Sequence, residues 1–429
     1  MKYRGTYERI DSDVLRTRFY HHYLDYPFLL ILDSNSNQYD QHSEFRLLLA
    51  VGRNKVEFNT HNRWEQLKQE YDAGQWLLGY IGYDLKNETE NIQSLNTDYT
   101  GFPEITFFKP DILVIENNAG LHIYSDTQEP DSIYQLLHSD IVNSDQAHFK
   151  ISSVEIRQRT PKEKYLHQVG SIIEDIRDGN YYEINYCQEF YVEGLTADPF
   201  VLFEKMNQKT KMPFASFLKL DRKYILCCSP ERYLKKKGRQ WLSQPIKGTS
   251  ARSTSEDVDH KNKLKLEHSE KERAENLMIV DLVRNDLRRS SKTGTVKVDE
   301  LCKVYSFIPV HQMISTISAE LQDEVHPITA LKRTFPMGSM TGAPKIETMK
   351  RIDQLEDTKR NVYSGCMGYI NPDGDFDFNV VIRTLIYNTE TAYASYHAGS
   401  AITYDSDPQS EYEECLLKAQ TFFSLVMKD

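Results

Sequence analysis

Residues 214–234 (FASFLKLDRKYILCCSPERYL) contain three consecutive strand-like runs and determine the fold class. Apolar residues dominate 214–220 and 224–229, and a third run covers 232–234, with no helix between the runs. Strands that follow one another in this way do not fit a regular alternation of strands and helices. The runs on either side of this stretch show whether the whole chain has the same organisation.

Elsewhere in the chain, strands are also grouped rather than each followed by a helix. Predicted strands cover 28–34, 46–52, 76–83, 112–116, 121–124, 181–192, 311–321, 365–370, 379–387 and 392–399. Predicted helices cover 131–140, 161–178, 198–208, 263–289 and 410–426, and a further helix starts near Lys345. The charged segment 253–263 is predicted to be a loop. This grouping favours a largely antiparallel α+β protein.

Length and composition exclude several classes of protein. With 429 residues, the chain is long enough for two or three domains, and the polar segment 143–160 suggests a boundary between regions 1–150 and 151–429. A net charge of −11 without a basic stripe argues against a nucleic-acid partner. Because no apolar run is long enough to span a bilayer and no signal-peptide core follows Met1, we expect a cytoplasmic protein without a membrane partner.

The six cysteines do not form a metal-binding pattern. Their spacing matches no zinc motif, and Cys227 and Cys228 are too close in sequence for an ordinary disulfide. We expect reduced thiols in the core of a cytoplasmic protein.

One lysine is placed where it could act as a nucleophile. Residues 244–252 (QPIKGTSAR) set Lys247 between a strand-like run and a predicted turn at Gly248 and Thr249. Gly248 can adopt a positive φ or let a ligand approach the backbone. An amine is nucleophilic only after it loses its proton, so burial or a neighbouring cation must lower the lysine pKa from about 10.4. The alternative is an ordinary surface lysine in a turn.

Two predicted helices carry the same pattern of acidic residues. Glu272 and Glu275 lie three residues apart in the helix at 263–289, and Glu411 and Glu414 repeat this spacing in the helix at 410–426. Together they offer carboxylates for one hard cation such as Mg²⁺. The alternatives are surface pairing with neighbouring lysines and, in the second helix, complementation of the helix dipole. Periodicity places Glu411 at the edge of the apolar face and Glu414 away from it.

Three other segments could bind an anion. The glycine-rich loop at 335–345 precedes a helix and can present backbone N–H groups. Arg383 lies within a predicted apolar strand, where a charge needs a partner. The segment 397–401 can expose further backbone donors. Each also has a structural explanation, as a loop, an edge-strand cation or a tight turn.

Considered together, these motifs resemble the chorismate-utilising enzymes, the family of anthranilate, aminodeoxychorismate, isochorismate and salicylate synthases. The resemblance extends from about Arg159 to Gln420. Its motifs are SPER at 229–232, PIKGT at 245–249, ERAEN at 272–276, DLVRND at 281–286, GSMTGAPK at 338–345, YSG at 363–365, IRT at 382–384 and DSDPQSE at 405–411. It implies the anthranilate synthase component I fold, with largely antiparallel sheets packed as a sandwich, helices outside, and regions 1–150 and 151–429 intertwined.

The lysine in PIKGT is similar to that of the aminodeoxychorismate synthase component I branch, whereas anthranilate synthases usually carry alanine there. The resemblance implies that Lys247 attacks C2 of chorismate and expels the C4 hydroxyl, which Glu231 protonates. Ammonia then adds at C4 and displaces the enzyme, giving 4-amino-4-deoxychorismate for 4-aminobenzoate and folate synthesis. Because the chain shows no glutaminase or lyase region, we expect ammonia from a separate glutamine amidotransferase and pyruvate release by another enzyme.

The resemblance also implies the ligand-binding residues. Glu275 and Glu414 would ligate Mg²⁺, with Glu272 and Glu411 beside them. The substrate-binding residues would be Thr249, Tyr363, Arg383, Gly399 and Ala401.

Three positions depart from the family pattern. Gln312 stands where a histidine is common, Ala401 replaces a common glycine, and 210–214 (TKMPF) replaces the stretch that typically binds tryptophan. The rival functions are anthranilate synthase component I and a non-catalytic regulatory subunit of the same fold.

Overall fold

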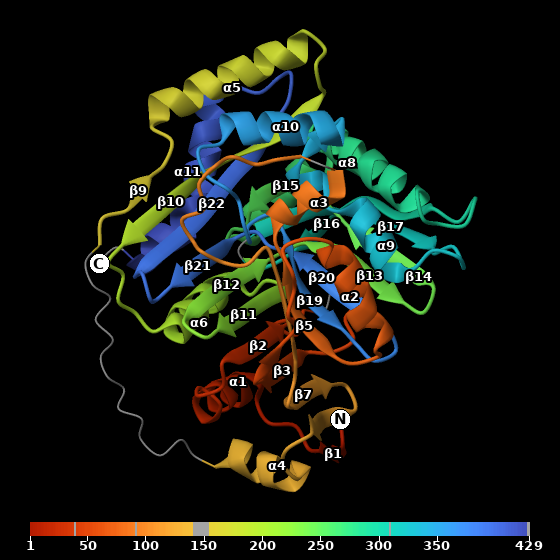
Figure 1. Cartoon of the computed structure of the whole chain (residues 1–429). Coiled ribbons are helices and arrows are strands. Elements are labelled where there is room, and N and C mark those ends of the chain that lie inside the picture. The colour runs from red at the N-terminus through yellow and green to blue at the C-terminus, as the bar shows by residue number, and fades with distance from the viewer. Residues whose placement is uncertain (38–39, 91, 140–153, 309, 427–429) are drawn as a thin grey trace.

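The computed structural model describes residues 1–37, 40–90, 92–139, 154–308 and 310–426. Two large sheets of antiparallel strands form its framework (Figure 1). In order across the first sheet, the strands are β1 (Tyr3–Tyr7), β8 (Gly120–Ser125), β7 (Ile112–Asn117), β3 (Leu47–Gly52), β2 (Phe28–Asp33), β11 (Phe214–Leu220), β12 (Lys223–Ser229), β21 (Thr384–Asn388), β22 (Tyr393–Ile402), β10 (Glu183–Glu193) and β18 (Gly342–Ala343), and β9 (Arg157–Gln158) also pairs with β10.

The second sheet contains the strand that carries Lys247. Its order is β15 (Ile246–Ala251), β17 (Val310–Glu320), β14 (Gln240–Gln244), β13 (Arg232–Lys237), β20 (Phe376–Val380), β19 (Cys366–Ile370), β5 (Leu77–Ile81), β6 (Ile105–Lys109) and β4 (Asn54–Lys55), and β16 (Lys297–Ser306) also pairs with β17. The helices are α1 (Ser12–His22), α2 (Arg63–Asp72), α3 (Lys86–Glu90), α4 (Pro130–His138), α5 (Lys162–Arg177), α6 (Pro199–Thr210), α7 (Glu256–Glu267), α8 (Glu270–Arg288), α9 (Pro327–Thr334), α10 (Lys345–Leu355) and α11 (Pro408–Val426).

Two hydrophobic cores hold these layers together. One core joins the sheets, with Leu218 and Ile386 from the first sheet in the same cluster as Tyr80 and Phe378 from the second. The other core covers the opposite face of the first sheet, where α1, α5, α6 and α11 contribute buried apolar side chains. The predicted α+β sandwich with helices outside is therefore confirmed.

Both sheets combine strands from distant parts of the sequence. β2 pairs with β11, and β5 pairs with β19, so each sheet joins a block of strands from before residue 140 to a block of strands from after residue 153. Most of the boundary predicted at 143–160 lies outside the described residues.

The prediction of a loop at 253–263 followed by one helix at 263–289 was wrong. The chain forms α7 and α8, separated at His268 and Ser269. Ser269 caps α8, since its side chain accepts a hydrogen bond from the Glu272 N–H. In α7 the only buried residue is Leu266, so this charged helix lacks the apolar periodicity that identifies a helix in sequence.

The predicted single strand at 379–387 was also wrong. It consists of the end of β20 in the second sheet and the start of β21 in the first. Arg383 lies between them with φ of +54°, so it is not within a strand. The segment is largely apolar because it stays mostly buried while it crosses from one sheet to the other, and periodicity does not reveal that change.

Other elements were not predicted, among them α1, α2, α9 and β16. β16 is largely exposed and polar, and α1 has buried and exposed residues in a weakly amphipathic pattern. The six cysteines are free and buried, as predicted. No helix in the described ranges is long and apolar enough to span a membrane.

Candidate active site

One face of β10 connects three of the predicted site residues. Successive side chains of a strand point to opposite faces, so Glu183, Asn185 and Cys187 lie on the same face. Glu183 Oε1 accepts a hydrogen bond from Lys247 Nζ at 2.7 Å. Cys187 Sγ lies 3.6 Å from the hydroxyl of Tyr363.

Asn185, which lies between Glu183 and Cys187 on this face, connects β10 to Glu231 through Ser339. Its side-chain N–H₂ donates to the backbone oxygen of Ser339 at 3.3 Å, and the hydroxyl of Ser339 donates to Glu231 Oε1 at 2.8 Å. β10 therefore links three candidate site residues from other segments: Lys247 through Glu183, Glu231 through Asn185 and Ser339, and Tyr363 through Cys187.

Lys247 lies in β15, and its side chain is only 11% exposed. The predicted turn is instead an irregular strand, because the pairing register of β15 with β17 shifts between Ile246 and Thr249. Gly248 has φ of +88°, a conformation that favours glycine. A surface lysine is excluded, and the local geometry turns the amine toward β10.

The Lys247 amine is held in its protonated form. Burial acts to lower its pKa, but the charge and hydrogen bond of Glu183, with smaller contributions from Glu275 and Glu231, raise it above the ordinary value. The ion pair with Glu183 is therefore the resting state, and nucleophilic attack requires a proton acceptor.

Glu231 has the protonation behaviour of an acid that works near neutrality. Burial raises its pKa to about 7, against the hydrogen bond from Ser339, the charge of Lys247 and the backbone amide of Ile246. Its position between β12 and β13 places it 4% exposed. Such a carboxyl can hold a proton at pH 7 and donate it to a leaving group.

The carboxylates of α8 face the same region. Burial raises the pKa of Glu275 to about 7, and repulsion from Glu272 and Glu183 adds to this effect, against the attraction of Lys247. Burial and repulsion from Glu414 likewise raise the pKa of Glu272. The predicted surface pairing exists in part, since Lys271 lies 3.9 Å from Glu275. Lys271 therefore offsets only part of the effect of burial and mutual repulsion on these carboxyl groups.

The carboxylates of α11 have protein partners. Glu411 is buried, and its two oxygens accept hydrogen bonds from the hydroxyls of Ser400 and Ser406. Glu414 is 49% exposed and pairs with Lys418 at 2.6 Å. Although burial acts to raise the pKa of Glu414, Lys418 lowers it overall. Glu414 is exposed, as its predicted position away from the apolar face implies, whereas Glu411, predicted at the edge of that face, is buried.

The donor set fits a hard cation that also takes ligands from solvent or substrate. Within the described ranges, no three acidic, histidine or cysteine side chains are close enough to hold a metal ion by themselves. Mg²⁺ commonly binds one or two carboxylates together with waters and substrate oxygens. Since Glu272 repels both Glu275 and Glu414, a cation among them would offset that repulsion.

The predicted substrate-binding side chains differ in their surroundings. Tyr363 is buried, and its ring stacks on His397 at 5.1 Å between centroids. Arg383 is half-buried, and its guanidinium makes no hydrogen bond or ion pair with any residue that the structure describes. A half-buried cation without a protein partner is suited to a substrate anion. Thr249 is exposed.

Gly399 and Ala401 lie on β22, opposite Cys187 and Asn185 of β10. A Cβ at Gly399 would come within 2.1 Å of the Tyr186 carbonyl oxygen, so the close approach of the two strands requires glycine. The Gly399 carbonyl accepts a hydrogen bond from Lys418 at 2.8 Å. This lysine thus bridges β22 and Glu414.

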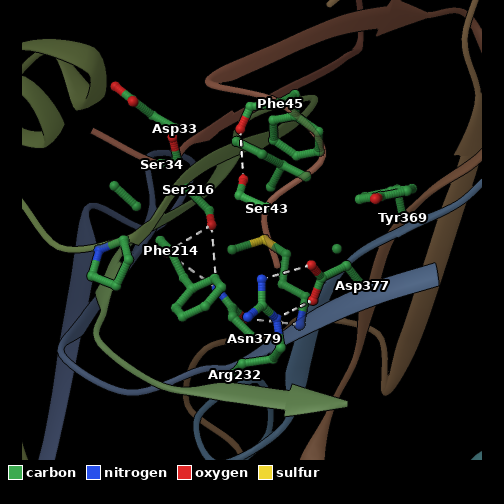
Figure 2. A pocket seen from close by; sticks show the side chains of 15 residues that line it. Asp33, Ser34, Ser43, Phe45, Phe214, Ser216, Arg232, Tyr369, Asp377 and Asn379 are labelled. Carbon is green, nitrogen blue, oxygen red and sulfur yellow. Dashed lines mark hydrogen bonds and ion pairs between the residues drawn. The ribbon is translucent and has the colours of Figure 1, made fainter. Parts of the chain in front are cut away.

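A separate pocket lies where β2, β11 and β13 meet (Figure 2). It is lined by residues that include Ser34 and Phe214, the latter from the stretch at 210–214. The Arg232 guanidinium in this pocket is already bound by Asp40 and Asp377. The positive charge of Arg232 is therefore paired with two carboxylates of the protein itself and is not available to a ligand in this pocket. His311 and Gln312 of β17 are both buried, and His311 bonds Asp259 and Ser306.

Sequence reasoning did not single out Glu183, Lys418 or the role of Ser339. A glutamate inside the otherwise buried run at 181–192 was a usable signal, because a buried carboxylate requires a partner. The identity of that partner could not be read from periodicity.

Comparison with known proteins shows the family of the chain. A family model for chorismate binding enzymes matches residues 23–424. A probable chloroplastic aminodeoxychorismate synthase of Oryza sativa subsp. japonica is 36% identical over 396 residues, covering 83% of this chain and 44% of that protein. Aminodeoxychorismate synthase component 1 of Escherichia coli (strain K12) is 34% identical over 364 residues, covering 82% and 77%.

A solved structure has the same overall fold. Anthranilate synthase component I from Streptococcus pneumoniae TIGR4 aligns with a TM-score of 0.75 at 25% identity, covering 98% of this chain and all of that one. The chain spans less than half the length of the plant relatives that it matches.

Proposed function

Because the chain belongs to the chorismate-binding enzyme family, we propose that it converts chorismate and ammonia to 4-amino-4-deoxychorismate, the reaction of aminodeoxychorismate synthase component I. The observation that carries this proposal is the burial of Lys247 among Glu183, Glu231 and Glu275. Burial of a lysine and its acidic neighbours carries a desolvation cost, and a role of the lysine in the reaction would explain why it is kept there. The names of the rice and Escherichia coli relatives support the same reaction.

In this proposal Lys247 and Glu231 act on opposite ends of one displacement. The neutral amine of Lys247 forms a bond to C2 of chorismate, both double bonds of the conjugated ring diene shift, and the C4–O bond breaks. Glu231, with its pKa of about 7, gives its proton to the departing hydroxyl, which leaves as water. Ammonia then bonds to C4, and the amine of Lys247 leaves C2.

The charged and polar groups around the reaction would position the dianionic substrate. Arg383 and Tyr363 would bind the enolpyruvyl carboxylate near Gly399 and Ala401, and Thr249 would line the ring pocket. Glu275 and Glu414 would hold Mg²⁺, with Glu272 and Glu411 beside them. The ion, when bound, supplies positive charge for the ring carboxylate.

Ammonia would come from a separate glutamine amidotransferase, and the product would feed 4-aminobenzoate and folate synthesis in the cytoplasm. The designation "component 1" of the bacterial relatives supports an enzyme that works with another component.

Product identification tests the proposal. The protein is incubated with chorismate, Mg²⁺ and ammonium, and the products are separated and identified by mass spectrometry. We expect 4-amino-4-deoxychorismate without release of pyruvate. Anthranilate and pyruvate would instead identify an anthranilate synthase, the activity named for the Streptococcus pneumoniae structure. The absence of turnover would favour a non-catalytic subunit.

A further inference from the structure

Glu183 is a buried carboxylate with one free oxygen. Its side chain is 1% exposed, and Oε1 accepts the 2.7 Å hydrogen bond from Lys247 Nζ. Oε2 is also buried but has no hydrogen-bond partner among the described residues. A fully ionised carboxylate normally has both oxygens hydrogen-bonded when it is removed from water. Glu183 therefore has a vacant acceptor beside the amine that must lose a proton.

We propose that Glu183 is the catalytic base that takes the proton of Lys247 before the lysine attacks its substrate. This inference rests on the proposed function, because it concerns a lysine that reacts as a neutral amine. Glu183 contacts the reacting nitrogen directly.

Other acidic groups around Lys247 are less suited to this task. Glu231 must keep its proton for the leaving hydroxyl, and Ser339 already bonds one of its oxygens. Glu275 influences Lys247 electrostatically, but among the described residues the ion pair within 4 Å of Nζ is with Glu183. The charged groups that face the lysine are Glu183 of β10, Glu231 before β13, Glu272 and Glu275 of α8, and Glu414 of α11.

The transfer conserves charge within the pair. The proton moves from Lys247 Nζ to Glu183, which changes an ammonium and a carboxylate into an amine and a carboxylic acid. Burial disfavours both ions, so the neutral pair becomes accessible without moving charge through the protein. The lone pair freed on Nζ then forms the bond to carbon. After the amine leaves the product, Glu183 returns the proton and restores the ion pair.

The test measures formation of the lysine adduct without ammonia. Wild type, Glu183→Gln and Glu183→Asp are mixed with chorismate and Mg²⁺ across a pH range, and intact mass is followed over time. We expect Glu183→Gln to slow adduct formation by about 10²- to 10⁴-fold at pH 7. Although the loss of Glu183 lowers the pKa of Lys247, the amine must then lose its proton to solvent while Glu275 and Glu231 still favour the charged form, so the optimum should move to higher pH.

Glu189→Gln is the matched control. Glu189 is a buried glutamate on the same face of β10, but it bonds Arg159 and Tyr393 instead of Lys247. We expect this variant to form the adduct at nearly the wild-type rate and with the wild-type pH profile. Glu183→Asp keeps a carboxylate at a greater distance, so its rate should fall between those of wild type and Glu183→Gln while it keeps the wild-type optimum.

The outcomes separate this inference from the proposed function. If Glu183→Gln forms the adduct at the wild-type rate with an unchanged optimum, Glu183 is not the base, whereas the lysine mechanism stands. If Glu183→Gln does not fold, Glu183→Asp decides, since an unchanged rate in that variant contradicts the inference. If wild type itself forms no adduct under conditions that support turnover, the lysine mechanism fails.

Discussion

Ser339 donates a 2.8 Å hydrogen bond to Glu231 in a site where burial raises the pKa of the carboxyl to about 7. The Ser339 hydroxyl holds one oxygen of the Glu231 carboxyl in place. Because the pKa of Glu231 is about 7, part of this carboxyl is protonated near neutral pH. Glu231, just after the end of β12, is therefore a candidate proton donor.

Replacing Glu231 by glutamine should lower the rate of adduct formation by about 10²- to 10⁴-fold, because the amide cannot protonate the leaving hydroxyl. Binding of chorismate should change little, since glutamine has nearly the same shape. Stopped reactions analysed by mass spectrometry measure the rate, and equilibrium dialysis measures binding. An unchanged rate would exclude Glu231 as the acid.

Glu231 should also make stability depend on pH. Its folded pKa of about 7 lies above the ordinary value of 4.5. The stabilising contribution is therefore fully present below pH 4.5 and is lost as pH rises through 7, a change of about 3 kcal/mol. Urea unfolding from pH 4.5 to 8 should show a smaller decline in Glu231→Gln. The decline in stability that remains in Glu231→Gln is expected from other groups such as Glu275, whose pKa is also raised to about 7. Equal slopes in both proteins would contradict this.

Removal of the metal should abolish turnover, and Glu275→Gln should weaken the response to Mg²⁺. Thermal unfolding with chorismate and increasing Mg²⁺ measures this response without relying on activity. We expect the midpoint of the titration to rise at least tenfold in Glu275→Gln. Glu413→Gln is the control, since Glu413 neighbours Glu414 but is exposed and bonds Gln409. Indistinguishable titrations of both variants and wild type would argue against this metal site.

Arg383→Lys should raise KM for chorismate about tenfold or more, because lysine cannot form the bidentate contact that arginine makes with a carboxylate. Arg284→Lys on α8 is the control, since Arg284 is exposed and pairs with Asp281. Steady-state kinetics measures both. Equal KM values for the two variants would remove Arg383 from the binding site.

Gly399→Ala should destabilise the protein by about 1–3 kcal/mol, because its Cβ would collide with the backbone of β10. In contrast, Gly170→Ala in α5 should be neutral or stabilising by up to about 1 kcal/mol, since nothing lies within 4 Å of its added Cβ. Urea unfolding distinguishes the two. A tolerated alanine at 399 would contradict the close strand contact.

Local sequence patterns predicted the elements whose pattern matches their burial. β2, β12 and α11 are clear examples, because continuous apolar runs form central strands and an apolar stripe forms a packed helix. α7 was missed because it buries few apolar side chains, so its sequence shows no apolar periodicity. The crossing at Arg383 was missed because β20 and β21, which belong to different sheets, form one continuous apolar run in the sequence.

Motifs singled out the candidate site residues, but the contacts among these residues could not be predicted from the sequence. The motifs indicated Lys247 and the glutamates of α8 and α11. The pairing of Lys247 with Glu183 joins residues 64 positions apart, from strands of different sheets. Such a contact depends on how the two sheets are packed, which local periodicity does not specify.

The decisive measurement is the intact mass of the protein with chorismate and Mg²⁺ in the absence of ammonia. We expect a species heavier than the protein by the mass of chorismate less one water, and peptide mapping should locate it on Lys247. The species should disappear on addition of ammonium and never form in Lys247→Ala. Turnover of chorismate and ammonium at full rate with alanine at position 247 would rule out attack by this lysine.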